Sequence, residues 1–222
     1  IITTVLLMLI VVIPVIVLTL VFAWRYRDTN PKQVGHAPRW ADNHTIELVV
    51  WGIPILIVLT LAVIAWKSSH ELDPYKPLAV AGNPQAKQLE IDVVALDWEW
   101  LFIYPEQGVA SLNEVAFPAH QPVAFHITSD ATMNSFFIPQ LGGQIYAMAG
   151  MRTKLHLIAD APGTYQGISA NFSGAGFADM RFQAIATTDD KGFNDWLANA
   201  KAAGKSLDLA SFQALSHAEK QI

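Results

Sequence analysis

The sequence predicts a membrane-anchored fold in three parts: an antiparallel hairpin of two transmembrane α-helices, an all-β sandwich, and C-terminal amphipathic helices. Three observations predict this order. They are two long uncharged segments near the start of the chain, a two-residue periodicity from about residue 88, and a return to three-to-four-residue spacing near the end. We expect the hairpin at 1–67, a connector at 68–87, the sandwich at 88–187 and the helical segment at 188–222.

The composition agrees with a chain that is partly embedded in a membrane. Of its 222 residues, 52% are hydrophobic and 15% are charged, whereas about 25% are charged in an ordinary soluble chain. This balance excludes a disordered chain, and the formal net charge of -5 argues against nucleic acid as a partner. The chain has no cysteine, which excludes a disulfide scaffold, a cysteine nucleophile and any thiolate-bound metal.

Both N-terminal segments are long enough to cross a bilayer as helices. No charged residue occurs in 1–24 or in 48–66. At about 1.5 Å per residue these segments reach roughly 36 and 28 Å, close to a hydrocarbon core of about 30 Å. We therefore expect spans at about 1–24 and 46–66. The alternative is a soluble protein with two long buried helices, but such helices would still carry some polar residues.

The distribution of basic residues predicts the orientation of the hairpin. Four basic residues lie between the spans, and only two lie within about 20 residues beyond the second span. The first set is Arg25, Arg27, Lys32 and Arg39, and the second is Lys67 and Lys76. Because cytoplasmic loops are enriched in Lys and Arg, we expect the loop inside the cytoplasm and the long C-terminal part outside it.

Beyond the connector, apolar residues alternate with polar ones as they do in half-buried strands. Examples are the segments 89–93, 123–128 and 155–159, which are separated by turn signals such as Ala161-Pro162-Gly163. Short strands spaced in this way predict an antiparallel sandwich or barrel.

The last segment changes period again. Phe193, Trp196, Leu197 and Ala200 are spaced three to four apart after Asp189, a candidate N-cap. We expect a helix that Gly204 ends, then a weaker helix, both packing on the sandwich or on a partner.

Few residues suggest chemistry by themselves. The seven histidines are His36, His44, His70, His120, His126, His156 and His217. Since they show no tight metal-ligand spacing, we expect surface or hydrogen-bonded side chains, with a metal role as the alternative. No nucleophile-elbow, phosphate-loop or zinc-protease motif occurs.

One aromatic cluster and one carboxylate stand out. Four aromatic residues at alternate positions predict one face of a strand: Trp98, Trp100, Phe102 and Tyr104. We interpret that face as core or interface, with electron transfer or partner docking as the alternative. Glu47 begins the second span, where a carboxylate suits the helix dipole; alternatively, it feeds a proton pathway at the membrane entrance.

Several motifs together resemble subunit II of the haem–copper respiratory oxidases. They are the entry into the second span (46–54, IELVVWGIP), the tryptophan-rich strand (98–104), the segment 133–139 (MNSFFIP) and the loop 163–180. MNSFFIP, QIYAMAGM and GISANFSGAGF are similar to the cytochrome bo-type ubiquinol oxidase branch. The resemblance implies a cupredoxin-like sandwich and covers most of residues 1–187.

The departures from the family pattern concern its binuclear copper centre, which takes two Cys, two His, a Met and a Glu carbonyl. By resemblance, Asn134 and Phe177 stand at the positions of the two His, and Ser169 and Ser173 at those of the two Cys. Asn171 stands at the position of the Glu, and Met180 at that of the Met. Only Met180 keeps the ligand type. A serine hydroxyl does not ionise near neutral pH and is a hard ligand, so it cannot replace a bridging thiolate. We therefore expect a lost copper site and no cofactor in this chain.

By resemblance, the chain is subunit II of a proton-translocating quinol oxidase in a bacterial inner (plasma) membrane, with its C-terminal domain on the periplasmic side. The complex would oxidise ubiquinol and reduce O2 to water, and the isolated chain would not be catalytic. Haems, copper and ubiquinone are expected in the partner catalytic subunit I. Other oxidase subunits and membrane lipids are further partners, and Glu47 would lie near the cytoplasmic mouth of a proton pathway.

Two other classes remain as alternatives: an electron-transfer copper protein, and a membrane-anchored extracytoplasmic binding or sensory module. The chain begins with Ile rather than Met, so we expect that it starts after processing or trimming. An upstream signal peptide or lipid anchor is compatible with that start.

Overall fold

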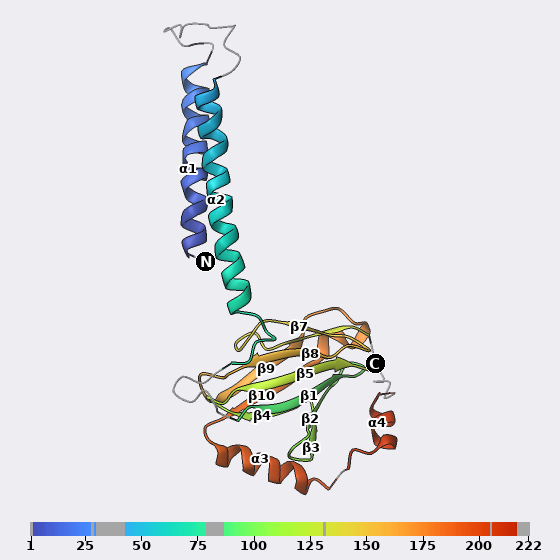
Figure 1. The fold of residues 1–222 in the computed structure, drawn as a ribbon. Helices are drawn as coiled ribbons and strands as arrows, with labels where there is room; N and C mark the ends of the chain where they lie inside the picture. Colours follow the sequence, from blue (N-terminus) through green and yellow to red (C-terminus); the bar gives the residue numbers. More distant parts are fainter. Residues whose placement is uncertain are drawn as a thin grey trace. The chain divides into compact units, whose positions relative to one another are not determined.

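The computed structural model describes residues 2–27, 29, 43–78, 87–130, 132–204 and 206–216. The chain divides into two compact units, Ile1–Leu72 and Asp73–Ile222. The first is helical and the second is mostly strand (Figure 1).

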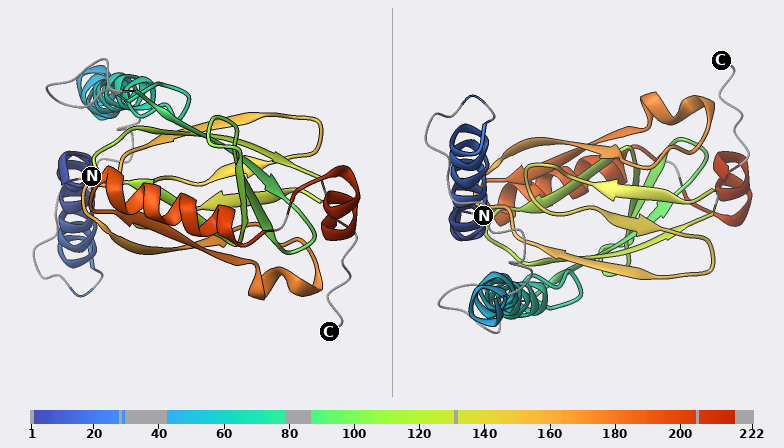
Figure 2. Two further views of the ribbon diagram at one scale, coloured as in Figure 1. Left: turned by 90° about the horizontal axis from the view of Figure 1, so that it is seen from below. Right: turned by 90° about the horizontal axis from the view of Figure 1, so that it is seen from above.

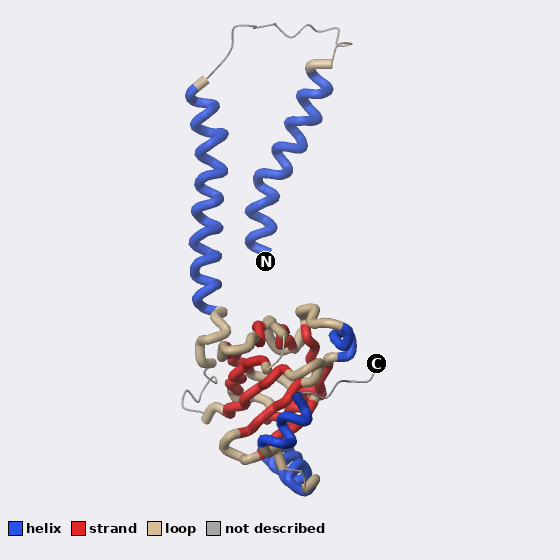
Figure 3. Tube along the Cα trace, turned by 90° about the vertical axis from the view of Figure 1, so that its right-hand side faces the viewer, coloured by secondary structure: helices blue, strands red, loops and turns tan. Residues whose placement is uncertain are grey.

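The first unit is a pair of long apolar helices, α1 (Ile2–Arg25) and α2 (His44–Glu71). They run antiparallel within the unit (Figure 3). Both are long and apolar enough to cross a membrane, with mean hydropathies of 3.3 and 2.8, and none of their described residues is buried. The prediction of two long apolar helices that form an antiparallel hairpin is confirmed. Lys32 and Arg39 lie outside the described residues.

The second helix is longer than the predicted span of 46–66. It begins two residues earlier because the Asn43 side chain caps it, accepting hydrogen bonds from the backbone N–H of Thr45 at 3.0 Å and of Ile46 at 3.2 Å. It continues to Glu71 through a polar turn that contains charged residues and therefore lies beyond the uncharged segment. The start of the predicted connector is therefore helical, and its residues 79–86 lie outside the described ones.

The described part of the second unit contains two five-stranded sheets. One has the order β3-β2-β1-β5-β8 and the other β4-β10-β9-β6-β7. The strands are β1 (Leu89–Ala95), β2 (Trp100–Tyr104), β3 (Val109–Leu112), β4 (Glu114–Pro118), β5 (Val123–Ser129), β6 (Asn134–Phe137), β7 (Ile145–Ala147), β8 (Thr153–Leu157), β9 (Gly163–Ser169) and β10 (Arg181–Thr187).

The expectation of a purely antiparallel sandwich is wrong in two places. β1 pairs in parallel with β5, and β4 pairs in parallel with β10. In each case the chain leaves the sheet and returns to it through other strands, as parallel neighbours require. Sequence alternation specifies which face of a strand is buried but not the direction of its partner.

The core lies between the two sheets and is rich in aromatic rings. Every second residue of β1 and β5 is almost fully buried, as the alternation predicted. Phe136 from one sheet contacts Trp100 and Phe125 from the other at ring-centroid distances of 5.4 and 5.3 Å, and it stacks on Phe182 at 4.9 Å. These contacts join the two sheets.

Helix α3 (Asp190–Ala202) follows the sandwich as predicted and packs along it (Figure 2). The Asp189 side chain caps it by accepting a hydrogen bond from the backbone N–H of Gly192 at 2.8 Å. Phe193 and Leu197 are buried, and the indole N–H of Trp196 donates to Glu114 Oε1 at 2.6 Å. The last helix, α4 (Leu209–Ser216), is described throughout and has no buried residue.

Candidate functional site

The loop that by resemblance replaces a copper centre begins where β6 and β9 lie side by side. Asn134 opens β6 and Ser169 closes β9, and the ladder pairs Phe136 with Ser169. The Ser169 hydroxyl donates a hydrogen bond to Asn134 Oδ1 at 3.0 Å. Since the two residues are only 5% and 1% exposed, their polar atoms satisfy each other inside the protein, away from solvent.

Other hydrogen bonds, most of them between backbone atoms, hold the rest of the loop beside Asn134 and Ser169. The Asn171 side-chain amide donates to the Met133 carbonyl at 3.2 Å. The Ser169 N–H donates to the Met180 carbonyl at 3.1 Å, and the Met180 N–H donates to the Phe177 carbonyl at 3.2 Å. The Ser169 hydroxyl also donates to the Asn171 carbonyl at 3.4 Å, so hydrogen bonds connect five of the six predicted positions.

Ser173, the sixth position, is hydrogen-bonded to a side chain from the turn between β1 and β2. Its carbonyl accepts a hydrogen bond from the indole N–H of Trp98 at 3.2 Å. Its own hydroxyl is buried and has no hydrogen-bond partner among the described residues. A Cβ added at Gly176 would overlap the Trp98 ring, so the indole lies directly against the loop.

The aromatic strand is only partly as predicted. Trp100, Phe102 and Tyr104 lie on β2 and are fully buried, which confirms the interpretation as core. Trp98 is not on that strand. It lies in the turn before β2 with φ 59°, a left-handed conformation that breaks the alternation. Its ring therefore covers the loop instead of sharing the core face with the other three.

Phe177 and Met180 occupy different surroundings. Phe177 lies in a short 3₁₀ helix, Ala175–Asp179, and makes an edge contact with the exposed ring of Phe172 at 5.6 Å. Met180 is 1% exposed and belongs to the core. Among the side chains at the six positions, only this buried thioether matches the family's ligand type.

The donor set does not fit a binuclear copper centre. The groups gathered here are hydroxyls, amides and one thioether, and the buried side chains of Ser169 and Asn134 already hydrogen-bond to each other. Such oxygen donors are hard ligands, whereas a bridged copper pair needs soft thiolates and imidazoles. Among the described residues, no three His, Cys, Asp or Glu side chains gather as a metal-binding group.

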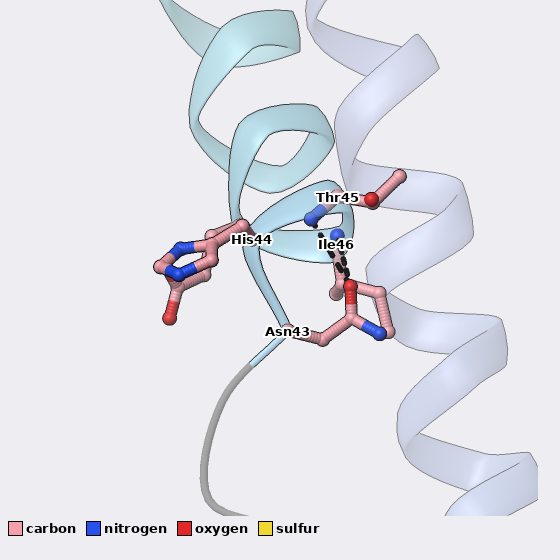
Figure 4. A network of polar contacts seen from close by, with 5 residues as sticks. Asn43, His44, Thr45 and Ile46 are labelled. Carbon is pink, nitrogen blue, oxygen red and sulfur yellow. Dashed lines mark hydrogen bonds and ion pairs between the residues drawn. The ribbon is translucent and has the colours of Figure 1, made fainter.

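Glu47 lies in the first turn of α2, beside the Asn43 cap drawn in Figure 4. Its carboxylate is 3.7 Å from His44 Nδ1, and both side chains are largely exposed at 55% and 93%. Glu47 is thus in the first turn of the helix, which starts two residues before the predicted span, and its carboxylate is exposed. The cap itself was missed, although Asn in front of an apolar run is a recognisable signal.

Two histidines on the outer face of the sandwich have specific surroundings. His156 Nδ1 is 3.0 Å from the Pro74 carbonyl. Burial, and next the positive charge of Arg152, lower the pKa of His126 below its usual value of 6.5, against the opposing effect of Asp92. Arg152 also forms an ion pair with Asp92 at 2.6 Å. His36 and His217 lie outside the described residues.

A groove of about 1040 Å³ lies between the β2–β3 hairpin and the two C-terminal helices. Its lining is mostly apolar and includes Leu101, Ile103, Val109 and Leu215. Of the predicted site residues, only Tyr104 reaches it, so it is not part of the loop site.

Comparison with known proteins finds relatives over most of the chain. The family described as "Cytochrome C oxidase subunit II, periplasmic domain" matches residues 84–186. The Pseudomonas aeruginosa protein "Cytochrome bo(3) ubiquinol oxidase subunit 2" is 58% identical over 215 residues, which cover 97% of this chain and 63% of that protein. The Acetobacter aceti protein "Ubiquinol oxidase subunit 2" is 53% identical over 209 residues, 94% of this chain and 67% of its own length.

This chain belongs to the quinol oxidase subunit 2 family. A more distant relative, "Quinol oxidase subunit 2" of Bacillus subtilis, is 40% identical over 191 residues, 86% of this chain and 58% of that protein. The chain thus spans only about 63% of the length of the Pseudomonas aeruginosa relative.

Solved structures support the fold of this family member. The periplasmic domain of cytochrome oxidase subunit II from Bradyrhizobium japonicum aligns with a TM-score of 0.50 at 23% identity, covering 54% of this chain and 97% of that one. A chain of a heme-copper terminal oxidase dimer aligns with a TM-score of 0.50 at 19% identity, covering 64% and 99%. At these identities the likeness shows the fold alone, and it confirms the cupredoxin-like sandwich.

Proposed function

We propose that this chain is subunit II of a respiratory complex that oxidises ubiquinol, reduces O2 to water and moves protons across a bacterial inner membrane. The chain holds no redox centre. Its relatives of 53 to 58% identity carry the name of ubiquinol oxidase subunit 2, and its two apolar helices are long enough to anchor it in a membrane. It binds the catalytic subunit, which holds the haems, the copper and the quinol.

The observation that carries the proposal is the buried hydrogen bond between Ser169 and Asn134. In the related copper subunits these two positions supply a thiolate and an imidazole to the metal. Here the two polar side chains satisfy each other, which leaves neither a thiolate nor an imidazole at the point where electrons would enter. Electrons therefore come from a membrane quinol through the catalytic subunit, and this chain acts as its cap and anchor.

The exposed carboxylate of Glu47 supports a second role at the cytoplasmic side. It lies at the start of α2, next to the loop that the excess of basic residues assigns to the cytoplasm. A titratable acid at the mouth of a membrane pathway can take up protons and deliver them to buried groups. Glu47 loads protons into the path that the catalytic subunit completes.

Purification in mild detergent tests the proposal. A tagged chain expressed in a ubiquinol-respiring bacterium should bring with it haem and ubiquinol oxidase activity. Copper should be present only in the amount that the catalytic subunit holds. A binding or sensory module would bring no haem, and an electron-transfer copper protein would bring extra copper that stays with the separated chain.

Protease treatment tests the orientation. In intact spheroplasts, external protease should cut the sandwich and spare the loop between α1 and α2. Cleavage of the sandwich only in inverted vesicles would contradict the proposed topology.

A further inference from the structure

Three of the five methionines of the chain lie at one end of the β6–β7 pair. Met133 directly precedes β6, Met148 directly follows β7, and Met151 comes three residues later. The antiparallel register pairs Ser135 with Tyr146 and Asn134 with Ala147. Met133 and Met148 each lie one residue outside the strands, at the end of the ladder that the Asn134–Ala147 pair closes.

A tight turn brings the third methionine to the same place. The Met151 N–H donates to the Met148 carbonyl at 3.2 Å, which closes a four-residue turn. Gly150, the third residue of that turn, has φ +75°, as a type II turn requires. The Cα atoms of Met148 and Met151 are then less than about 7 Å apart.

The three side chains are turned away from the core. Asn134 and Ala147, which form the neighbouring register pair, are 1% and 0% exposed. Alternation along the strands therefore sends Met133 and Met148 to the opposite, outer face. Met133 is 42% exposed and Met151 is 52% exposed, whereas Met180 in the core is 1% exposed. These thioethers do not serve to fill the interior.

We propose that Met133, Met148 and Met151 form a surface site for one Cu(I) ion, bound by their three thioether sulfurs. Thioethers are soft, uncharged ligands that select Cu(I) over harder divalent ions. The unbranched methionine side chain has three rotatable bonds, so three of them on neighbouring Cα atoms can converge on one ion. The site is distinct from the lost binuclear position, because Asn134 and Ser169 face the interior.

Competition with a coloured Cu(I) chelator, bathocuproine disulfonate, on the full chain in detergent tests this site. The chain should withdraw one equivalent of Cu(I) and no Zn(II). The triple variant Met133→Leu/Met148→Leu/Met151→Leu keeps apolar volume but removes the sulfurs, and its affinity should fall by about a hundredfold or more. Met8→Leu, in the first helix, is the matched control and should leave the affinity unchanged.

Methyl NMR identifies the ligands independently of affinity. With ¹³C-labelled methionine methyl groups, the redox-inert probe Ag(I) should shift the signals of Met133, Met148 and Met151 and leave those of Met8 and Met180 in place. Three results would overturn the proposal: no uptake of Cu(I), equal uptake by the triple variant, or Ag(I) shifts at Met8 or Met180. Uptake that survives in the triple variant would assign binding to histidines elsewhere and leave the methionine cluster as a contact surface.

Discussion

Placing copper ligands at the positions that the family resemblance assigns to its copper centre tests whether the loop has the geometry of such a site. The full set of changes is Asn134→His, Ser169→Cys, Asn171→Glu, Ser173→Cys and Phe177→His, with Met180 kept. The backbone hydrogen bonds that shape the loop, from Ser169 to Met180 and from Met180 to Phe177, do not depend on the replaced side chains. We expect the variant to bind a copper pair bridged by two thiolates.

The cost of these changes can be worked out from the contacts they remove. Losing the Ser169–Asn134 hydrogen bond costs about 1 kcal/mol. Losing the edge contact between Phe177 and Phe172 costs roughly 0.5–1.5 kcal/mol. Ser173→Cys should instead stabilise the fold, because it removes a buried hydroxyl that has no hydrogen-bond partner among the described residues. The free energy of unfolding of the metal-free variant should therefore be about 1–2 kcal/mol lower than that of the parent chain.

Copper should more than offset that loss. A ligand at 1,000 times its dissociation constant stabilises the folded state by about 4 kcal/mol. The unfolding midpoint of the variant should thus lie below that of the parent without copper and above it with copper. Visible absorption and electron paramagnetic resonance should show a purple, mixed-valence pair after copper uptake.

A matched control separates the thiolates from the other changes. The variant Asn134→His/Asn171→Glu/Phe177→His keeps both serines, so it should not give the purple spectrum. Circular dichroism must first show that each variant is folded. A folded five-site variant that takes up no copper would mean that the loop does not keep the copper-binding geometry.

Three further changes probe other parts of the chain. Glu47→Gln should slow quinol oxidase turnover and leave the haem content unchanged. The control Glu71→Gln, at the other end of α2, should have no effect. Full turnover in Glu47→Gln would mean that this carboxylate serves only to start the helix. Gly167→Ala places a Cβ into the ring of Phe182 and should cost about 1–3 kcal/mol in denaturant unfolding; this loss should shrink when Phe182→Leu is added. Because burial and a nearby arginine lower the pKa of His126, the folded state binds fewer protons, so the free energy of unfolding should fall as pH drops below about 6.5. His126→Gln should flatten that fall, measured as the unfolding midpoint from pH 7 to 5, and an unchanged slope would exclude His126 as its cause.

The features that could be predicted from the sequence follow from local patterns. Ile91 and Val93 alternate with acids, and both are fully buried. Asp189 was expected to cap the helix that follows, and its side chain does so. In each case a few neighbouring residues contain the whole signal, because the buried face or the cap is decided within one element.

The features that could not be predicted depend on contacts between distant residues. Trp98 has the correct spacing for β2 but takes a left-handed backbone, because its ring closes on a loop that comes 75 residues later. The parallel pairing of β1 with β5 likewise depends on how the chain crosses between sheets. The loop positions themselves came from resemblance to a family, since serines and asparagines carry no signal of a former metal site.

The Tyr104 hydroxyl limits how the sandwich can associate with other chains. It accepts a hydrogen bond from the Ala116 N–H at 2.8 Å and donates one to the Ala116 carbonyl at 2.9 Å. Ala116 lies on β4, an outermost strand of its sheet, and a row of free N–H and carbonyl groups on such a strand invites a foreign strand to pair. A phenol from the opposite sheet occupies both groups at this residue, and α3 packs over the same strand. Growth of the sheet by strand addition is therefore blocked at this residue of the outermost strand.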